Sequence, residues 1–304
     1  MEHKRRKKKV RASQIVKIVV VVLILGGIIA GGTLYLVATP IGNLSDISNR
    51  AVKVLSEVDF VAAEDTRNGG KLLHLLGISK PFVSYFEHNK AEKGPQIVEK
   101  LKSGQSCALI TDAGTPAISD PGADLVRLCI EENIPVTALP GCCAAINALI
   151  LSGFDTRRFY FEGFLEGNEN AKRARLEELA RLTATLILYE APHRLRETLA
   201  LMREAFGGAR KIALCREMTK LNEDIFRTDL DGAVAYYEQN DPRGEYVLAV
   251  AGKAGEDMPF FEKMTVREHV AFYEAAGMSR MDAMKAAAKD RGVGKGEIYK
   301  AMIE

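Results

Sequence analysis

Two acids and an arginine stand together where an apolar run ends, at Glu64-Asp65-Thr66-Arg67. Charged side chains at the end of a buried strand are costly unless they face a cleft or are paired. In a cleft, a carboxylate can act as a general base and a guanidinium can orient a phosphate. The alternative is structural, with Asp65 capping the next helix and Arg67 bonding a neighbouring acid. A second polar group at 84–89 (SYFEHN) adds Glu87 as a candidate base.

The richest loop follows another apolar run and covers 111–122 (TDAGTPAISDPG). It has two prolines, two acids and no long side chain, so its backbone can approach a ligand closely. Asp112 and Asp120 could receive amines or hydroxyls. A plain turn followed by helix capping would explain Asp120-Pro121-Gly122, but not the whole run.

Several other turns contain residues suited to binding. The turn at 38–46 (ATPIGNLSD) has proline and glycine close together, which fixes a tight turn with exposed backbone amides. It is not the G-x-G-x-x-G of dinucleotide-binding folds, and the sequence has no Walker A loop. The stretch 292–296 (GVGKG) lacks a preceding strand and is predicted to be a turn between helices. Further candidates are 189–194 (YEAPHR) and 216–221 (REMTKL), where a lone His193 favours a hydrogen bond at a helix start over catalysis.

These loops follow apolar runs that alternate with amphipathic stretches, which predicts an α/β fold whose ligands bind after the carboxyl ends of strands. The predicted strands are 33–39, 60–64, 107–111 and 135–139, then 159–161, 185–189, 211–216 and 245–251. The predicted helices are 49–58, 96–102, 123–132, 170–181 and 193–205, followed by 265–275, 280–291 and 295–303. We therefore expect an N-terminal α/β lobe over 32–139, a second α/β lobe over 140–253, and a helical module over 254–304. A mostly parallel sheet covered on both faces is expected from this alternation.

The net charge and the spacing of the cysteines narrow the classes of function that the chain can have. Residues 1–31 hold eight basic side chains and one acid, and the totals of 42 and 40 leave 34 basic and 39 acidic side chains elsewhere. The remaining 273 residues thus carry −5, so bulk charge does not indicate nucleic-acid binding. The five cysteines show no CxxC spacing, which is typical of a reducing compartment and favours the cytoplasm. No Cys/His cluster suggests zinc, and we predict no metal.

The N-terminal segment combines a basic stretch over 1–14 with an apolar run over 15–31. This layout is that of a leader or weak tether, and less that of a true membrane anchor, because 17 residues are at the short end of what spans a bilayer. A mis-started extension before a domain beginning at Gly32 is the third interpretation.

The loops, in this order, resemble the tetrapyrrole-methylase-like family of S-adenosylmethionine (SAM)-dependent methyltransferases, and most closely its RNA-modifying branch. The stretches that carry the resemblance are ATPIGNLSDI (38–47), AEDTR (63–67), SYFEHN (84–89), LITDAGTPAISDPG (109–122), ALPG (138–141), YEAPHRL (189–195), REMTKLNED (216–224) and GEYVLAVAG (244–252). The family pattern after Leu139 is usually PGPSA, whereas this chain has PGCCA, and Phe86 stands where the family commonly shows His.

The resemblance implies a homodimer with SAM held in a cleft between two α/β lobes. The cofactor-binding residues that it implies are Pro40, Gly42, Asn43, Asp112, Gly114, Thr115, Pro116, Pro140, Gly141 and Ala191. It further implies that the methyl acceptor is the 2′-hydroxyl of a cytidine in the decoding centre of 16S ribosomal RNA. The substrate would be either the naked RNA or the RNA within the small ribosomal subunit.

The catalytic candidates for such a reaction are Glu64, Asp65 or Glu87 as the base, with Arg67 and Lys220 orienting phosphate or ribose. RNA contact would rely on a local basic patch. Its candidates are Lys220, Arg194, Arg196, Arg280, Lys285, Lys289, Arg291 and Lys295. The alternatives are a small-molecule tetrapyrrole methylase and a membrane-tethered, non-catalytic SAM-binding protein.

Overall fold

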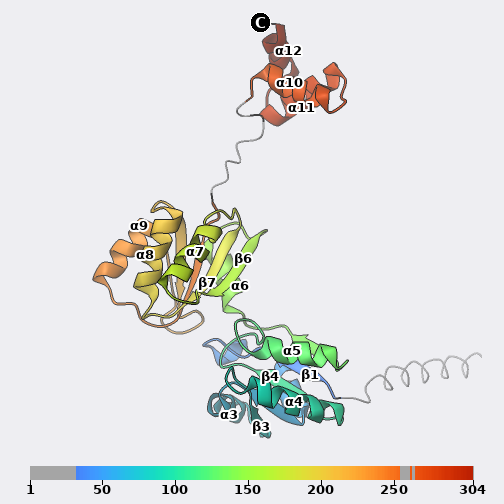
Figure 1. Ribbon diagram of the computed structural model, residues 1–304, viewed down its shortest axis with the longest axis vertical. Helices are drawn as coiled ribbons and strands as arrows, with labels where there is room; N and C mark the ends of the chain where they lie inside the picture. Colours follow the sequence, from blue (N-terminus) through green and yellow to red (C-terminus); the bar gives the residue numbers. More distant parts are fainter. Residues whose placement is uncertain (1–31, 254–260, 262–263, 304) are drawn as a thin grey trace, which may run out of the picture.

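The computed structural model describes residues 32–253, 261 and 264–303. Within them lie two α/β lobes and a group of three helices set apart from the lobes (Figure 1). The predicted leader over 1–31 falls outside the described residues. None of the helices in the described ranges is long and apolar enough to cross a bilayer.

The first lobe contains a five-stranded sheet in which every strand pair is parallel. Its strands are β1 (Leu34–Val37), β2 (Phe60–Ala63), β3 (Phe82–Ser84), β4 (Cys107–Ile110) and β5 (Val136–Leu139), in the order β3-β2-β4-β1-β5. The parallel arrangement brings all carboxyl ends to one edge, so the loops after β1, β2 and β4 gather there.

Alternating residues of these strands face two apolar layers, which is why the runs are continuously hydrophobic. One layer packs Phe60 and Leu109 against α4 (Lys90–Lys102) and α5 (Gly122–Glu131). The other packs Val61 and Ile110 against α2 (Asn49–Glu57) and α3 (Thr66–Leu75). The expectation of a parallel sheet covered on both faces is therefore confirmed in this lobe.

The expected parallel arrangement of strands is wrong for the second lobe, whose sheet is mixed. Its strands are β6 (Phe159–Phe164), β7 (Thr185–Glu190), β8 (Lys211–Arg216), β9 (Asp224–Asp229) and β10 (Tyr246–Val250), in the order β6-β7-β10-β8-β9. Only β6 and β7 are parallel, because β10 runs antiparallel between β7 and β8, and β8 pairs antiparallel with β9. Apolar periodicity reports burial and not strand direction, so the sequence could not give this arrangement.

The second sheet is also covered on both faces. Helices α7 (Glu169–Leu179), α8 (Leu195–Phe206) and α9 (Leu230–Gln239) pack on one face, and α6 (Ala144–Ser152) on the other. The sequence prediction missed β3, α6, β9, α9 and the 3₁₀ helix η1 (Leu44–Asp46), and only the capping alternative for Asp65 implied α3. The edge strand β9 (DIFRTD) is polar and partly exposed, and α6 is apolar on all sides, so neither shows the expected period.

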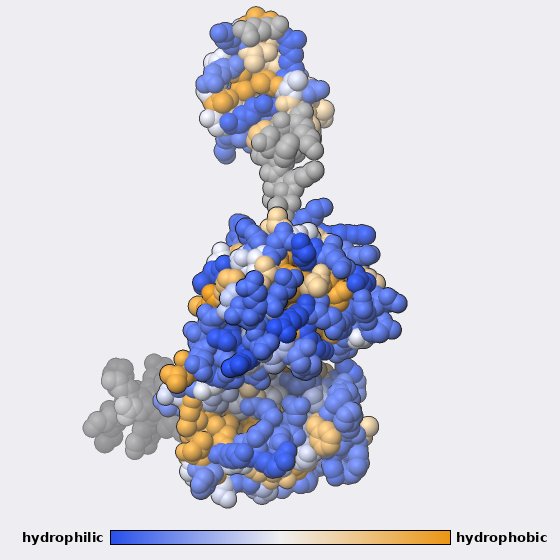
Figure 2. All heavy atoms as spheres, turned by 90° about the vertical axis from the view of Figure 1, so that its left-hand side faces the viewer, coloured by the Kyte–Doolittle hydropathy of each residue, from blue (hydrophilic) through white to orange (hydrophobic). Residues whose placement is uncertain are grey.

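The three C-terminal helices agree with prediction. They are α10 (Val266–Ala275), α11 (Arg280–Arg291) and α12 (Lys295–Ile303), and they share an apolar core of their own. Gly292 ends α11 in the left-handed conformation at φ 64°, so 292–296 is a turn between helices as predicted. On the side of the molecule that Figure 2 presents, the surface of the second lobe is mainly hydrophilic.

Leu248 lies in the central strand β10 and is fully buried, whereas Leu221 is fully exposed. We expect Leu248→Ala to lower the free energy of unfolding by about 2–5 kcal/mol, because it removes buried methyl groups and leaves a cavity. The matched variant Leu221→Ala should change it by less than about 0.5 kcal/mol. Chemical denaturation followed by circular dichroism measures both, and equal effects would contradict the assigned burial.

Candidate functional site

A cavity of about 470 Å³ lies between the two lobes. The first lobe contributes the loops after β1, β2 and β4, and the second contributes the start of α6, the ends of β6 and β7, the loop after β8 and the start of β10. Its lining residues are Ile41, Glu64, Thr111, Asp112, Ala113, Gly114, Thr115, Ile118, Ser119, Asp120, Cys143, Ala144, Phe164, Tyr189, Glu190, Ala191, Pro192, Glu217, Met218, Lys220, Glu245, Tyr246 and Val247. The size and mixed lining are those of a site for a small organic ligand.

The loop after β4 is folded by its own Asp120. The carboxylate of Asp120 accepts hydrogen bonds from the backbone N–H groups of Ala117 (3.0 Å), Ile118 (3.1 Å) and Gly122 (2.7 Å). These bonds hold Ala117 and Ser119 at positive φ, 69° and 62°. Asp120 thus shapes the cavity wall, and its bond to Gly122, the first residue of α5, agrees with the alternative of a turn that leads into a helix. Ligand contact by this loop stays a prediction.

The loop after β1 connects the two lobes. Thr39 exchanges two backbone hydrogen bonds with Gly114, 2.9 and 3.1 Å long, which ties this loop to the loop after β4. Ile41 packs into an apolar cluster of the second lobe. A Cβ on Gly42 would lie 2.4 Å from Cγ of Lys220, so the turn requires glycine at this close approach.

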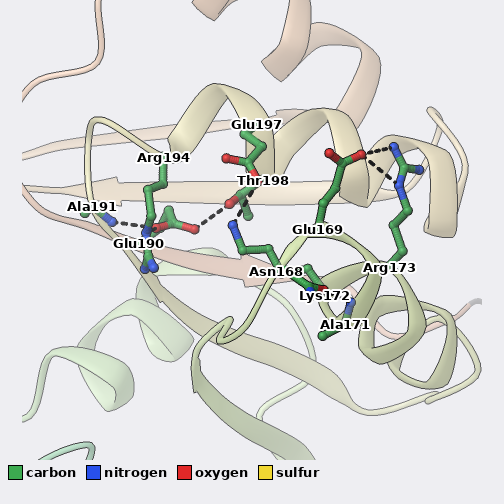
Figure 3. Close-up of polar contacts among 10 residues, drawn as sticks. All are labelled: Asn168, Glu169, Ala171, Lys172, Arg173, Glu190, Ala191, Arg194, Glu197 and Thr198. Carbon is green, nitrogen blue, oxygen red and sulfur yellow. Dashed lines mark hydrogen bonds and ion pairs between the residues drawn. The ribbon is translucent and has the colours of Figure 1, made fainter.

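The wall contributed by β7 is held by a buried carboxylate (Figure 3). Glu190 is 3 % exposed and accepts hydrogen bonds from Ala191 N (2.8 Å), Arg194 Nε (2.9 Å) and Thr198 Oγ1 (2.5 Å). This arrangement fixes the turn that presents Ala191 to the cavity. Because the charge of Glu190 is paired and hydrogen-bonded, the buried group is tolerated.

Lys220, in the loop after β8, forms ion pairs with two acids of the lining. Its Nζ lies 2.9 Å from Glu217 and 3.1 Å from Glu245. Burial opposes the charge of Lys220, but the bonds to the two carboxylates outweigh it and raise the pKa of the lysine. Hydrogen bonds from the Glu245 backbone and from Lys220 lower the pKa of Glu217.

Glu64 projects into the cavity without a hydrogen-bond partner among the described residues. Loss of hydration against the cavity wall raises the pKa of Glu64, and the nearby carboxylates of Asp112, Asp120 and Asp65 raise it further. In all, the lining includes six acids and one lysine. An electrostatic environment of this kind favours a ligand that carries positive charge.

The other predicted catalytic residues are not in the cavity lining. Asp65 caps α3 by accepting a hydrogen bond from Arg67 N (2.8 Å), and the Arg67 guanidinium pairs with Asp65 at 2.7 Å. The hydrogen bonds from Arg67 lower the pKa of Asp65 to about 2. Glu87 is exposed and pairs with Lys90 at 2.7 Å. The structural alternative considered for Asp65 and Arg67 therefore matches their geometry.

The predicted cofactor residues divide in the same way. Asp112, Gly114, Thr115 and Ala191 line the cavity. Six others stand behind or beside it: Pro40, Gly42, Asn43, Pro116, Pro140 and Gly141. Asn43 accepts a hydrogen bond from Ser45 N and caps the short 3₁₀ helix η1 (Leu44–Asp46).

The departure PGCCA falls on the cavity wall. Cys143 lines the cavity, and the Cys142 carbonyl accepts a 2.8 Å hydrogen bond from Thr115 Oγ1. Cys143 also stands at the N-cap of α6 without making a side-chain capping bond.

Sequence reasoning included Tyr189 and Met218 in its candidate loops 189–194 and 216–221, but it missed Phe164 and Tyr246, which also line the cavity. These residues lie in or beside strands, where an apolar side chain reads as core. Burial raises the pKa of Tyr189 to about 12, so its hydroxyl stays protonated at neutral pH. Within the described part of the chain, no group of three or more His, Cys, Asp or Glu residues could hold a metal ion.

Known proteins resemble this chain in both sequence and fold. The family model of tetrapyrrole (corrin/porphyrin) methylases matches residues 33–233. Two solved structures share the fold at low identity: uroporphyrin-III-C-methyltransferase of Thermus thermophilus (TM-score 0.53, 19 % identity, 73 % of this chain and 94 % of that one) and the cobalamin biosynthetic cobalt precorrin-4 methyltransferase (TM-score 0.51, 18 % identity, 74 % and 95 %).

Proteins related in sequence are more similar to this chain than these two structures are. The protein named ribosomal RNA small subunit methyltransferase I of Synechocystis sp. is 44 % identical over 273 residues, covering 90 % of this chain and 98 % of the relative. Its namesake from Bacillus subtilis is 45 % identical over 274 residues, with 89 % and 94 % covered. The Haemophilus influenzae protein of that name is 50 % identical over 228 residues, with 74 % and 81 % covered. The chain therefore belongs to the tetrapyrrole methylase family of methyltransferases, within the group named ribosomal RNA small subunit methyltransferase I.

Proposed function

We propose that the protein transfers a methyl group from SAM to the 2′-hydroxyl of a cytidine in the decoding centre of 16S ribosomal RNA. The observation that carries the proposal is the acidic cavity between the lobes, in a chain whose relatives are named for ribosomal RNA methylation. The acceptor would be presented by the small ribosomal subunit, in the cytoplasm, to a homodimer.

The cavity has the features that SAM requires. SAM carries a sulfonium and an amine, and the lining has six acids against one lysine. The loop after β4 presents Thr111–Thr115 with short side chains, which lets the backbone lie close to a nucleoside. We propose Asp112, Gly114, Thr115 and Ala191 as the residues that contact the cofactor. Pro40, Gly42, Asn43, Pro116, Pro140 and Gly141 would support them from outside the lining.

When bound, SAM supplies an electrophilic methyl group, so the chain's own task is to align and deprotonate the acceptor. We propose Glu64 as the general base, because it lines the cavity and its carboxylate has no competing partner among the described residues. Its proton acceptance would leave the ribose oxygen free to attack. Arg67, whose side chain is 85 % exposed at the start of α3, bonds Asp65 through Nε and Nη2, so its Nη1 would be the group that orients a neighbouring phosphate. Asp65 and Glu87 would hold Arg67 and Lys90 in position.

The second candidate function is methylation of a small tetrapyrrole, which the two structures of similar fold favour. Incubation of the protein with methyl-labelled SAM and small subunits from cells that lack the endogenous enzyme distinguishes the two. We expect label on one cytidine 2′-oxygen. SAM binding without transfer to subunits or to free RNA would overturn the ribosomal assignment.

Replacement of Glu64 by Gln should reduce turnover by about 10²- to 10⁴-fold, because the base is lost. As the pH is lowered, the wild-type rate should begin to fall at a higher pH than it would if the base had the pKa of an ordinary glutamate. The reason is that the raised pKa of Glu64 causes its carboxylate to be protonated at a higher pH. This acid limb should disappear in the variant. Single-turnover rates across pH provide the measurement, with Glu131→Gln as the control, because Glu131 is exposed at the end of α5 and lies outside the cavity lining. An unchanged rate for Glu64→Gln would show that Glu64 is not the general base.

Gly114→Ala should weaken SAM binding at least tenfold. Gly114 has φ 87° and an added Cβ would lie 3.3 Å from Ile41 Cγ2, so the substitution distorts the cavity wall. Gly104→Ala is the matched control, because Gly104 has φ 97° with open space around it and lies outside the cavity. Both variants lose some stability. Calorimetric titration with SAM should separate them, and equal affinities would contradict the assignment.

A further inference from the structure

All three basic residues of the lobes that the sequence suggested for RNA contact form ion pairs in the structure. Lys220 pairs with Glu217 and Glu245, Arg194 with Glu190, and Arg196 with Asp241. A paired cation has little charge left to offer a phosphate. The cavity itself is acidic, so it would repel the RNA backbone around the acceptor. RNA affinity must come from another surface.

Unpaired cations gather in a groove at the opposite end of the second lobe. This groove of about 680 Å³ lies among the last turns of α7 and α8, the start of β8 and the residues after β10. Four cations line it, namely Arg181, Arg210, Lys211 and Lys253, against one acid, Glu177. Lys211 pairs with Asp229 at 3.0 Å, but the other three have no carboxylate within 4 Å in the described residues.

Arg210 makes the groove rigid. Its guanidinium donates to the carbonyls of Ala251 (3.0 Å) and Ala180 (2.9 Å), and its Cζ lies 5.5 Å from the centroid of the Phe206 ring. These bonds hold the guanidinium without neutralising it, and burial lowers its pKa. Arg181 and Lys253 are exposed on the rim. The groove therefore presents the fixed guanidinium of Arg210 beside apolar side chains, with the long, exposed side chains of Arg181 and Lys253 at its rim.

We propose that this groove, defined by Arg181, Arg210 and Lys253, binds the phosphate backbone of the substrate RNA. An arginine held by carbonyls retains donors for a phosphate, and lysine binds phosphate as a point charge. The groove also stands where the chain leaves the second lobe, immediately before the segment that leads to α10–α12. The exposed Arg280, Lys289 and Lys295 of those helices would extend the contact. The proposal rests on the proposed function for the identity of the RNA.

The test compares charge reversals in the full chain. Arg181→Glu/Lys253→Glu leaves the bonds of Arg210 intact and should weaken binding to a 16S ribosomal RNA transcript at least tenfold. It should also reduce the slope of log K against log salt by about 2, one for each lost phosphate contact. Arg181→Lys/Lys253→Arg keeps the charges and should bind like the wild type. Arg50→Glu/Lys71→Glu makes the same charge change at exposed, unpaired positions of the first lobe and should have a much smaller effect.

Fluorescence anisotropy with labelled transcript gives affinity and salt slope, and calorimetry with SAM checks that the cavity is unchanged. Equal losses in the groove and first-lobe variants, or an unchanged salt slope, would overturn the proposal. Weaker binding to assembled subunits with normal binding to the transcript would also overturn it, by indicating a ribosomal protein as the partner. Methyl transfer is scored separately at saturating RNA. If the wild type transfers no methyl group while the groove variants still lose RNA affinity, the proposed function is overturned and the proposed RNA-binding groove is supported.

Discussion

The cavity depends on one packing contact between the lobes. Ile41, from the turn after β1, is buried in the apolar cluster formed by α6 and the second sheet. The backbone of the same turn is bonded to Gly114 through Thr39, so the loop after β4 is held in place as well. Moving Ile41 would displace both walls together, because the turn is short and its Gly42 lies directly against Lys220.

Charge is distributed so that cofactor and RNA contacts are separated. Carboxylates dominate the cavity, and the lysine that lines it is held by two of them. Such a site suits a cationic methyl donor and disfavours phosphate. An enzyme acting on RNA with this cavity needs its phosphate contacts outside it, and the groove beside Arg210 together with the C-terminal helices offers them. A chain whose residues 32–304 carry −5 can bind RNA when its unpaired cations are concentrated in this way.

Neighbouring carboxylates show how position decides chemistry. Glu64 and Asp65 are adjacent in the sequence, yet their pKa values shift in opposite directions. Glu64 faces other acids across the cavity, whereas Asp65 caps a helix and accepts hydrogen bonds from Arg67. The helix start turns one side chain toward the cavity and the other toward the arginine.

The sequence alone determined the α/β class, the order of most strands and helices, the three C-terminal helices and most of the loops that line the cavity. Apolar periodicity and small-residue turns report burial and loop positions directly, because both are local properties of the chain. Only the tertiary structure decided that the second sheet is mixed, that Glu64 and not Asp65 or Glu87 enters the cavity, and that Phe164 and Tyr246 line it. It also decided which cations are neutralised. Strand direction and ion pairing depend on residues distant in sequence: Lys220 meets Glu245 only because β8 and β10 are paired side by side.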